Sequence, residues 1–367
     1  MPTFGAPGER IGYTVYSHPQ GAPPLLLLHG FTASAASFIS NIPVLRRDFT
    51  VITVDLLGHG ASDAPIEVAP YRPEAAVSRL IGLLDHLGYH RALVCGHSLG
   101  GALALRLALD HPDRVAGLIV INSNSGAGDA EWRRQALPGL QAMAAQVRAE
   151  GTGILRNTRL YPAASRRLPE AARRLLTEDF DRLTAAGVAG TAEGLTANVN
   201  AFERLPELTV PTLVVVGDRD RDFARRAPAF VANMPRAAVQ VLTLEDAGHA
   251  ANLERPEEFD AAVLDFAQQL GYLDTAEAED DGPEPGSRGW LVIAGAAFVA
   301  LGAALLAASF ILGDDNEPTR AEPLPTRPPT TRVAGERTAG AAASALTPSP
   351  SAAPTDTPTA EPTATDT

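Results

Sequence analysis

Six short segments of the chain consist almost wholly of apolar residues, and patterns typical of helices separate most of them. The apolar segments are residues 23–30, 50–55, 92–97, 118–122, 212–217 and 239–244, and the helical patterns cover 73–87, 99–111, 223–234 and 256–270. A strand that is apolar at every position is covered on both faces, as in a parallel sheet between two layers of helices. The sequence therefore predicts an α/β fold with a mostly parallel, doubly wound sheet. An alternating segment near the start, residues 10–17, is typical of an antiparallel edge strand.

Residues from about 126 to 205 interrupt this alternation with helical stretches and no clear strand. We expect them to form a helical cap inserted into the sheet domain. Several arginines of this region occur in pairs, such as Arg166 and Arg167 or Arg173 and Arg174. They would suit a pocket for an anionic substrate, but solvated helix faces are the simpler interpretation of such a pattern.

The composition of the chain changes abruptly near Thr275. Residues 275–289 form an acidic linker, and the 23 residues from 290 to 312 contain no charge. A helix of that length, rising ~1.5 Å per residue, spans roughly 34 Å, which is enough to cross the hydrocarbon core of a bilayer. We therefore predict one domain at residues 1–274, a transmembrane helix at 290–312 in contact with membrane lipid, and a disordered Pro/Thr/Ala-rich tail at 313–367.

Two features predict opposite orientations for this membrane span. The first thirty residues contain no secretory signal, which would leave the large first domain in the cytoplasm and send the tail outside. The flanks favour the reverse, because Arg288 precedes the span whereas Arg320, Arg327 and Arg332 follow it. We give the large domain more weight and expect a single-pass protein of the cell membrane whose first domain is cytoplasmic.

The overall charge argues against one class of partner. The formal net charge is −13, and no basic stripe interrupts the acidic balance, so nucleic acid is not an expected partner. The chain has one cysteine, Cys95, which cannot form a disulfide within the chain. Its apolar neighbours predict a small buried strand residue.

The segment Gly96-His97-Ser98-Leu99-Gly100 follows a predicted strand and precedes a predicted helix. This context distinguishes a functional Gly-x-Ser-x-Gly motif from its chance occurrences. Glycines are needed two residues before and two residues after the serine, because side chains there would clash at a sharp strand-to-helix turn. Such a turn presents the hydroxyl of Ser98 as a nucleophile.

A serine hydroxyl is a poor nucleophile at neutral pH, so a histidine must take its proton and a carboxylate must orient that histidine. His249 follows the last predicted strand and is the candidate base. Three acids follow the strand before it, and we favour Asp220 over Asp218 and Asp222, although spacing alone leaves all three open. Three further histidines lie in glycine-rich turns, where we expect them to set the turn geometry: His29, His59 and His97.

The candidate serine, acid and histidine occur in the order found in the α/β-hydrolase superfamily, and the chain from about residue 10 to 271 resembles a member. Residues 29–31 resemble the oxyanion loop of that superfamily, and residues 55–63 resemble its structural Asp-x-x-Gly-x-Gly-x-Ser turn. The resemblance implies that the backbone N–H groups of Phe31 and Leu99 bind the oxyanion of a tetrahedral intermediate. It also implies that the reaction requires no metal and no cofactor.

The function that this resemblance implies is acyl transfer to water, with a small-molecule ester as the default substrate. Haloalkane dehalogenases and epoxide hydrolases are disfavoured, because they use an aspartate nucleophile and Ser98 stands at that position. Residues 27–34, 54–65 and 217–223 also resemble the menaquinone-pathway synthase that eliminates pyruvate, and the carbon–carbon bond hydrolases of aromatic degradation. Ala102 stands where the synthase usually has an arginine. A further alternative, an anchored binding domain without catalytic activity, is disfavoured because the serine and histidine are intact.

Overall fold

The computed structural model describes residues 1–18 and 21–273. They form one eight-stranded sheet with the strand order β1-β2-β4-β3-β5-β6-β7-β8. The strands are β1 Thr3–Phe4, β2 Ile11–Tyr16, β3 Pro24–Leu28, β4 Thr50–Asp55, β5 Ala92–His97, β6 Val115–Ile121, β7 Thr212–Gly217 and β8 Val239–Leu244. The strands from β4 to β8 in this order run parallel, whereas β2 is antiparallel to both of its neighbours. The predicted mostly parallel sheet is confirmed, although β1 and not β2 forms its edge.

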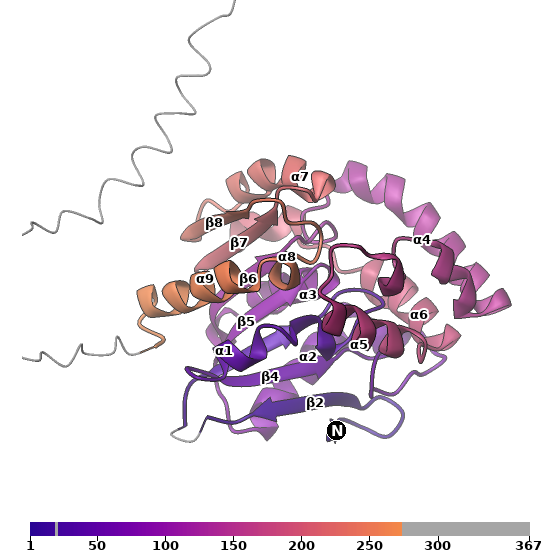
Figure 1. The fold of residues 1–367 in the computed structure, drawn as a ribbon, viewed down its shortest axis with the longest axis horizontal. Coiled ribbons are helices and arrows are strands. Elements are labelled where there is room, and N and C mark those ends of the chain that lie inside the picture. The colour runs from indigo at the N-terminus through magenta and orange to yellow at the C-terminus, as the bar shows by residue number, and fades with distance from the viewer. Residues whose placement is uncertain (19–20, 274–367) are drawn as a thin grey trace, which may run out of the picture. The chain divides into compact units, whose positions relative to one another are not determined.

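Helices cover both faces of the sheet. They are α1 Ile42–Leu45, α2 Pro73–His86, α3 Leu99–Asp110, α7 Arg221–Ala232, α8 Ala251–Glu254 and α9 Pro256–Gln269 (Figure 1). In β3, Leu26 and Leu28 pack in a core with α2, α3 and α7, whereas Leu25 and Leu27 pack in a second core with α1 and α9. All four leucines are at most 1% exposed, so alternate residues of the strand face different cores and both must be apolar.

Between β6 and β7 the described chain contains helices and no strand, in the interval for which the sequence predicts a cap. Its longer helices are α4 Ala130–Glu150, α5 Glu170–Phe180 and α6 Ala185–Gly190, and its short helical turns are η4 Thr152–Asn157, η5 Pro162–Ala164, η6 Thr191–Thr196 and η7 Phe202–Glu207. Figure 1 shows α4, α5 and α6 gathered together on one side of the sheet. Val147 of α4 packs against Val188 of α6 in a small core of their own. We refer to residues 126–205 as the cap.

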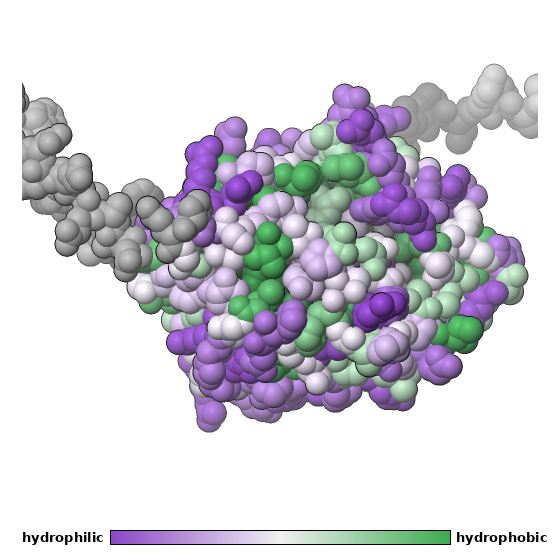
Figure 2. Space-filling view, turned by 90° about the horizontal axis from the view of Figure 1, so that it is seen from below, coloured by the Kyte–Doolittle hydropathy of each residue, from purple (hydrophilic) through white to green (hydrophobic). Residues whose placement is uncertain are grey.

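The remaining short turns are η1 Ala35–Phe38, η2 Ala69–Tyr71 and η3 Pro112–Arg114. On the face seen in Figure 2, hydrophobic residues form small patches among hydrophilic ones. Within residues 1–18 and 21–273, no helix has the length and apolar character needed to cross a membrane. The predicted linker, transmembrane helix and tail, residues 275–367, lie outside the described residues.

Candidate active site

Ser98 lies at the turn between β5 and α3, with a φ of +53° that L-residues rarely adopt. A Cβ atom on Gly96 would lie 2.2 Å from the carbonyl oxygen of Gly100, so the turn admits only glycine at position 96. The N–H of Ser98 donates to the carbonyl of Ile121 at 2.9 Å, and its carbonyl accepts from the hydroxyl of Ser123 at 2.7 Å. The end of β6 therefore holds the strained turn in place.

His249 follows β8, and its Nδ1 lies 2.7 Å from Oδ2 of Asp220. The three candidate acids have different partners: Asp218 accepts from the N–H of Ala247 at 3.2 Å, and Asp222 pairs with Arg225 at 2.9 Å. Asp220 alone of the three bonds to the histidine.

Asp220 precedes α7 and also accepts from the N–H of Phe223 at 3.4 Å. Burial raises the pKa of Asp220, but the hydrogen bond and charge of His249 outweigh it, and the pKa lies below its ordinary value. Because the carboxylate is ionised, Nδ1 of His249 donates to it and Nε2 is left as the proton acceptor.

Asn122 connects the loops that carry the acid and the histidine. It follows β6 directly, is fully buried, and has a φ of +42°. Its Oδ1 accepts from the N–H of Gly217 at 3.0 Å, and its Nδ2 donates to the carbonyls of Gly248 at 2.9 Å and His249 at 3.0 Å. This residue was not predicted from the sequence, in which its one local signal is a polar side chain directly after a wholly apolar strand.

His97 also holds the loop of His249. Its Nε2 lies 2.8 Å from the carbonyl oxygen of His249 and therefore donates to it. Burial lowers the pKa of His97 to about 3, so the ring is neutral at ordinary pH. The sequence analysis assigned His97 to turn geometry alone and did not anticipate this contact.

The loop after β3 is held by two buried histidines. The N–H of Leu56 donates to Nε2 of His29 at 2.9 Å, and the N–H of Thr32 donates to Nε2 of His59 at 3.2 Å. Burial lowers the pKa of His29 to about 4 and the pKa of His59 to about 3. Both rings therefore remain neutral acceptors for backbone N–H groups.

The two predicted oxyanion donors flank the same turn. The N–H of Phe31 donates to no other group of the described residues, and Leu99 is the first residue of α3, where an N–H has no partner within the helix. A Cβ on Gly30 would lie 3.1 Å from Cβ of Ser98, so the loop of Phe31 packs directly against the nucleophile turn. Both N–H groups are thus available to a ligand beside Ser98.

A cavity of about 300 Å³ contains Ser98 and His249 in its wall. The sheet domain supplies Phe31 and Leu253, and the cap supplies an apolar wall that includes Leu168. Small-molecule sites commonly combine such apolar walls with a few polar groups. The residues around the cavity that carry polar side-chain groups, other than Ser98 and the histidines, are Thr32, Ser37, Arg159, Tyr161, Ser165, Arg167, Asn252 and Glu254.

One cap arginine joins the cap to the loop of His249. Nη1 of Arg167 donates to the carbonyl of Asp246 at 2.8 Å and lies 3.5 Å from Oε2 of Glu254. The same Oε2 accepts from the N–H of Gly248 at 2.8 Å. The charge of Arg167 is thus matched by acids, whereas Arg159 has no ion pair with any described residue.

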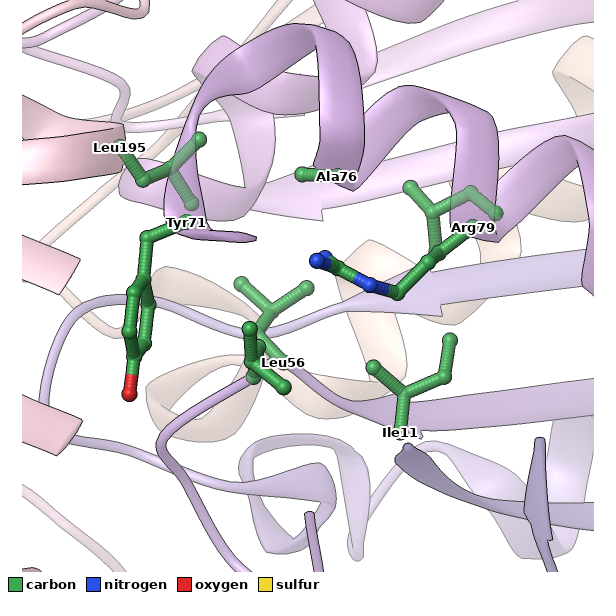
Figure 3. A pocket seen from close by; sticks show the side chains of 8 residues that line it. Ile11, Leu56, Tyr71, Ala76, Arg79 and Leu195 are labelled. Atoms are coloured by element: carbon green, nitrogen blue, oxygen red, sulfur yellow. The ribbon is translucent and has the colours of Figure 1, made fainter. Parts of the chain in front are cut away.

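A second cavity, of about 20 Å³, lies elsewhere in the domain and has room for about one water molecule. In Figure 3 the guanidinium of Arg79 points into the space between Leu56 and Ala76, and the hydroxyl of Tyr71 points away from it. Neither Ser98 nor His249 lines this cavity. Among the described residues, no group of three His, Cys, Asp or Glu side chains is arranged to hold a metal ion.

Residues 23–256 match the family model described as the alpha/beta hydrolase fold. A 3-oxoadipate enol-lactonase of Acinetobacter baylyi is 30% identical over 71% of this chain and 94% of its own. A Bacillus subtilis protein named as a 2-succinyl-6-hydroxy-2,4-cyclohexadiene-1-carboxylate synthase is 27% identical over 71% of this chain and 97% of its own. The solved structure of a thermophilic esterase from Thermogutta terrifontis is 27% identical with a TM-score of 0.61, covering 71% of this chain and 94% of that one. The chain belongs to the alpha/beta hydrolase family.

Proposed function

We propose that this chain is a serine hydrolase that cleaves a small carboxylic ester through an acyl-enzyme on Ser98. The observation that carries the proposal is the 2.7 Å contact between His249 and Asp220, with the histidine and Ser98 in the wall of one cavity. The similarity to an esterase and to an enol-lactonase supports it.

In the proposed reaction, Nε2 of His249 takes the proton from the hydroxyl of Ser98 as its oxygen attacks the ester carbonyl. The N–H groups of Phe31 and Leu99 stabilise the tetrahedral oxyanion. Its collapse breaks the bond to the alcohol oxygen, which receives the proton from His249. Water then attacks the acyl-enzyme and gives a proton to His249; the bond between the acyl carbon and the serine oxygen breaks, His249 returns the proton to that oxygen, and the acid is released. Asp220 stabilises the imidazolium in both steps.

A second candidate is the chemistry of the synthase or of carbon–carbon bond hydrolases, which the similarity to the Bacillus subtilis protein favours. Ala102, at the position where the synthase usually has an arginine, is fully buried and does not line the cavity. No cation from this position reaches a substrate. We therefore rank ester hydrolysis first, and a comparison of turnover on ester and on carbon–carbon bond substrates distinguishes the two.

Labelling with a fluorophosphonate tests the nucleophile directly. We expect the full-length chain to be labelled and to hydrolyse p-nitrophenyl esters, and Ser98→Ala to do neither. Ser78→Ala is a matched control, because Ser78 is an exposed residue of α2 outside the cavity. A folded wild-type chain that is not labelled would contradict the proposal and favour a binding domain without catalytic activity.

We also propose that residues 290–312 anchor the chain in the cell membrane, with residues 1–274 in the cytoplasm and the tail outside. The charge-free length of this segment supports the proposal. We expect the full-length chain to remain with membranes after an alkaline wash, and a chain shortened to end at Leu273 to stay in the supernatant. Protease added outside should remove only the tail. A full-length chain in the supernatant would exclude the anchor, and digestion of the first domain would reverse the orientation.

A further inference from the structure

Asn252 lines the Ser98 cavity and has a buried amide oxygen without a partner among the described residues. Asn252 lies in α8, three residues after His249, and is 1% exposed. Its Nδ2 donates to the carbonyl of Ser37 at 2.8 Å and to Oδ1 of Asn41 at 3.0 Å. Both amide hydrogens are therefore used, whereas Oδ1 is buried without a hydrogen bond to any described residue.

The orientation of this amide is fixed by its neighbours. Nδ2 of Asn41 donates to Oδ1 of Asp260 at 2.9 Å and to the carbonyl of Asn252 at 3.0 Å. Because the carbonyl of Asn252 can only accept, the NH₂ group of Asn41 must face it, and the oxygen of Asn41 must face the side chain of Asn252. Asn252 must then present its NH₂ group to Asn41. The unpartnered atom is therefore the oxygen of Asn252, a hydrogen-bond acceptor.

A hydroxyl lies on the same side of the cavity. Ser37, in η1, is 4% exposed, lines the cavity, and has a side chain without a hydrogen bond to any described residue. Its carbonyl is the group that holds the amide of Asn252, so the two residues are direct neighbours. A serine hydroxyl can donate as well as accept.

Apolar side chains line the cavity beside this pair. Leu253, beside Asn252, packs with Leu176 and Leu168 of the cap, and all three line the cavity. Buried polar atoms without partners are rare in native proteins, and each calls for an explanation such as a bound water or ligand. In an apolar wall, a ligand group that completes these hydrogen bonds is strongly preferred over one that cannot.

We propose that Asn252 and Ser37 form a polar subsite that binds a hydroxyl group of the substrate. The hydroxyl donates to Oδ1 of Asn252 and accepts from the hydroxyl of Ser37. A carboxylate cannot donate to the amide oxygen, and a charged ammonium is costly to bury beside apolar side chains, so a neutral hydroxyl suits the pair best. This inference rests on the proposed ester hydrolysis and defines its substrate class as hydroxylated esters.

The test uses the full-length chain and pairs of esters that differ by a hydroxyl in place of a methyl group. On the acyl side the pair is p-nitrophenyl 3-hydroxybutyrate, as each enantiomer, and p-nitrophenyl 3-methylbutyrate. On the alcohol side it is 2-hydroxyethyl butyrate and propyl butyrate. After division by the rates of alkaline hydrolysis, we expect kcat/KM to favour the hydroxylated ester of at least one pair by about ten- to a hundredfold.

Three variants assign that preference to the subsite. Ser37→Ala removes the hydroxyl but keeps the carbonyl that holds Asn252, and we expect it to reduce the preference several-fold. Asn252→Leu should abolish the preference, with Ser37→Ala as the independent measurement if that variant fails to fold. Thr53→Val is the matched control, because it also removes a buried oxygen without a partner but lies outside this cavity. We expect Thr53→Val to keep the full preference.

Two outcomes would overturn the subsite alone: a fluorophosphonate-labelled wild type without preference in either pair, or a preference that Ser37→Ala leaves unchanged. A folded chain that is not labelled would overturn the proposed function together with the subsite. The same labelled preparation thus separates the two failures.

Discussion

In the part of the cavity that the sheet provides, the loops of Ser98 and His249 are held by buried groups at 2.7–3.0 Å, among them the fully buried Asn122. In the part that the cap provides, the contacts to the same histidine loop come from Arg167, which is 46% exposed; it pairs with the 57% exposed Asp246 and with Glu254, and it donates to the carbonyl of Asp246. Exposed ion pairs contribute little and are screened by salt, whereas buried hydrogen bonds are costly to break. The difference teaches that the sheet holds the proposed reacting groups firmly, whereas contacts from the cap can change at little cost in stability.

The largest effect is expected at the nucleophile. Ser98→Ala should lower kcat for p-nitrophenyl esters by about a thousandfold or more, because no other group can form the acyl-enzyme. The temperature of thermal unfolding should fall by no more than a few degrees, since alanine fits wherever serine does. Residual turnover above one part in about a hundred would mean that the sheet does not supply the nucleophile.

The second largest effect is expected at the acid, Asp220. Asp220→Asn should lower kcat by about a hundred- to ten-thousandfold, because an amide can hold His249 in the wrong tautomer. Asp222→Asn is the matched control, two residues further along the chain and paired with the exposed Arg225. Steady-state kinetics of both variants decide the assignment. If Asp222→Asn or Asp218→Asn is the inactive variant, the acid is misassigned.

A buried carboxyl next to the cavity offers a test by pH. Burial raises the pKa of Asp260 to about 7, although the hydrogen bond from Asn41 lowers it. The folded state then binds a proton that the unfolded state releases near its ordinary value of 3.8. This stabilisation is complete below that value and is lost as the pH rises toward 7.

Asp260→Asn keeps an oxygen that can accept from Nδ2 of Asn41 and removes the titratable carboxyl group. Between pH 5 and pH 8, the free energy of unfolding of the wild type should therefore fall by about 2–3 kcal/mol relative to the variant. Denaturant unfolding at both pH values measures this difference. A constant difference between the two proteins would show that the carboxyl titrates in the same way in both states.

The smallest effect is expected at the cap. Arg167→Gln should raise KM by about two- to fivefold and leave kcat nearly unchanged, because it breaks exposed ion pairs and not the hydrogen bonds of the sheet. Added salt should raise the KM of the wild type toward that of the variant. Arg166→Gln, at an exposed neighbour outside the cavity, is the control. A hundredfold fall in kcat for Arg167→Gln would break the distinction between the two regions.

The sheet and the nucleophile turn could be predicted because their signals are local. A strand between two cores is apolar throughout, and the clash at Gly96 follows from the turn itself. The spacing of Asp218, Asp220 and Asp222 could not identify the acid, because that depends on which carboxylate lies next to His249 in the folded chain. Asn122 and Asn252 were missed for the same reason, since the partners of their side chains lie 95 or more residues away in the chain.

Cap residues were predictable only as a class. The sequence predicts helices and shows arginine pairs. It does not predict that Arg167 forms an ion pair with Asp246, or that Arg159 lies in the cavity wall without an ion pair to the described residues. These contacts depend on how the cap packs against the sheet domain. No local pattern in the cap encodes that packing.

Among the described residues, the side chain of Asn122 binds only main-chain atoms, those of Gly217, Gly248 and His249. The side chain of Asn122 therefore aligns the loop of the acid with the loop of the base from a position outside both loops. For an engineer, the other side chains of these loops can be randomised while the two glycines, Asp220 and His249 are kept. A library that varies position 122 would instead uncouple acid from base, even with every reacting group present.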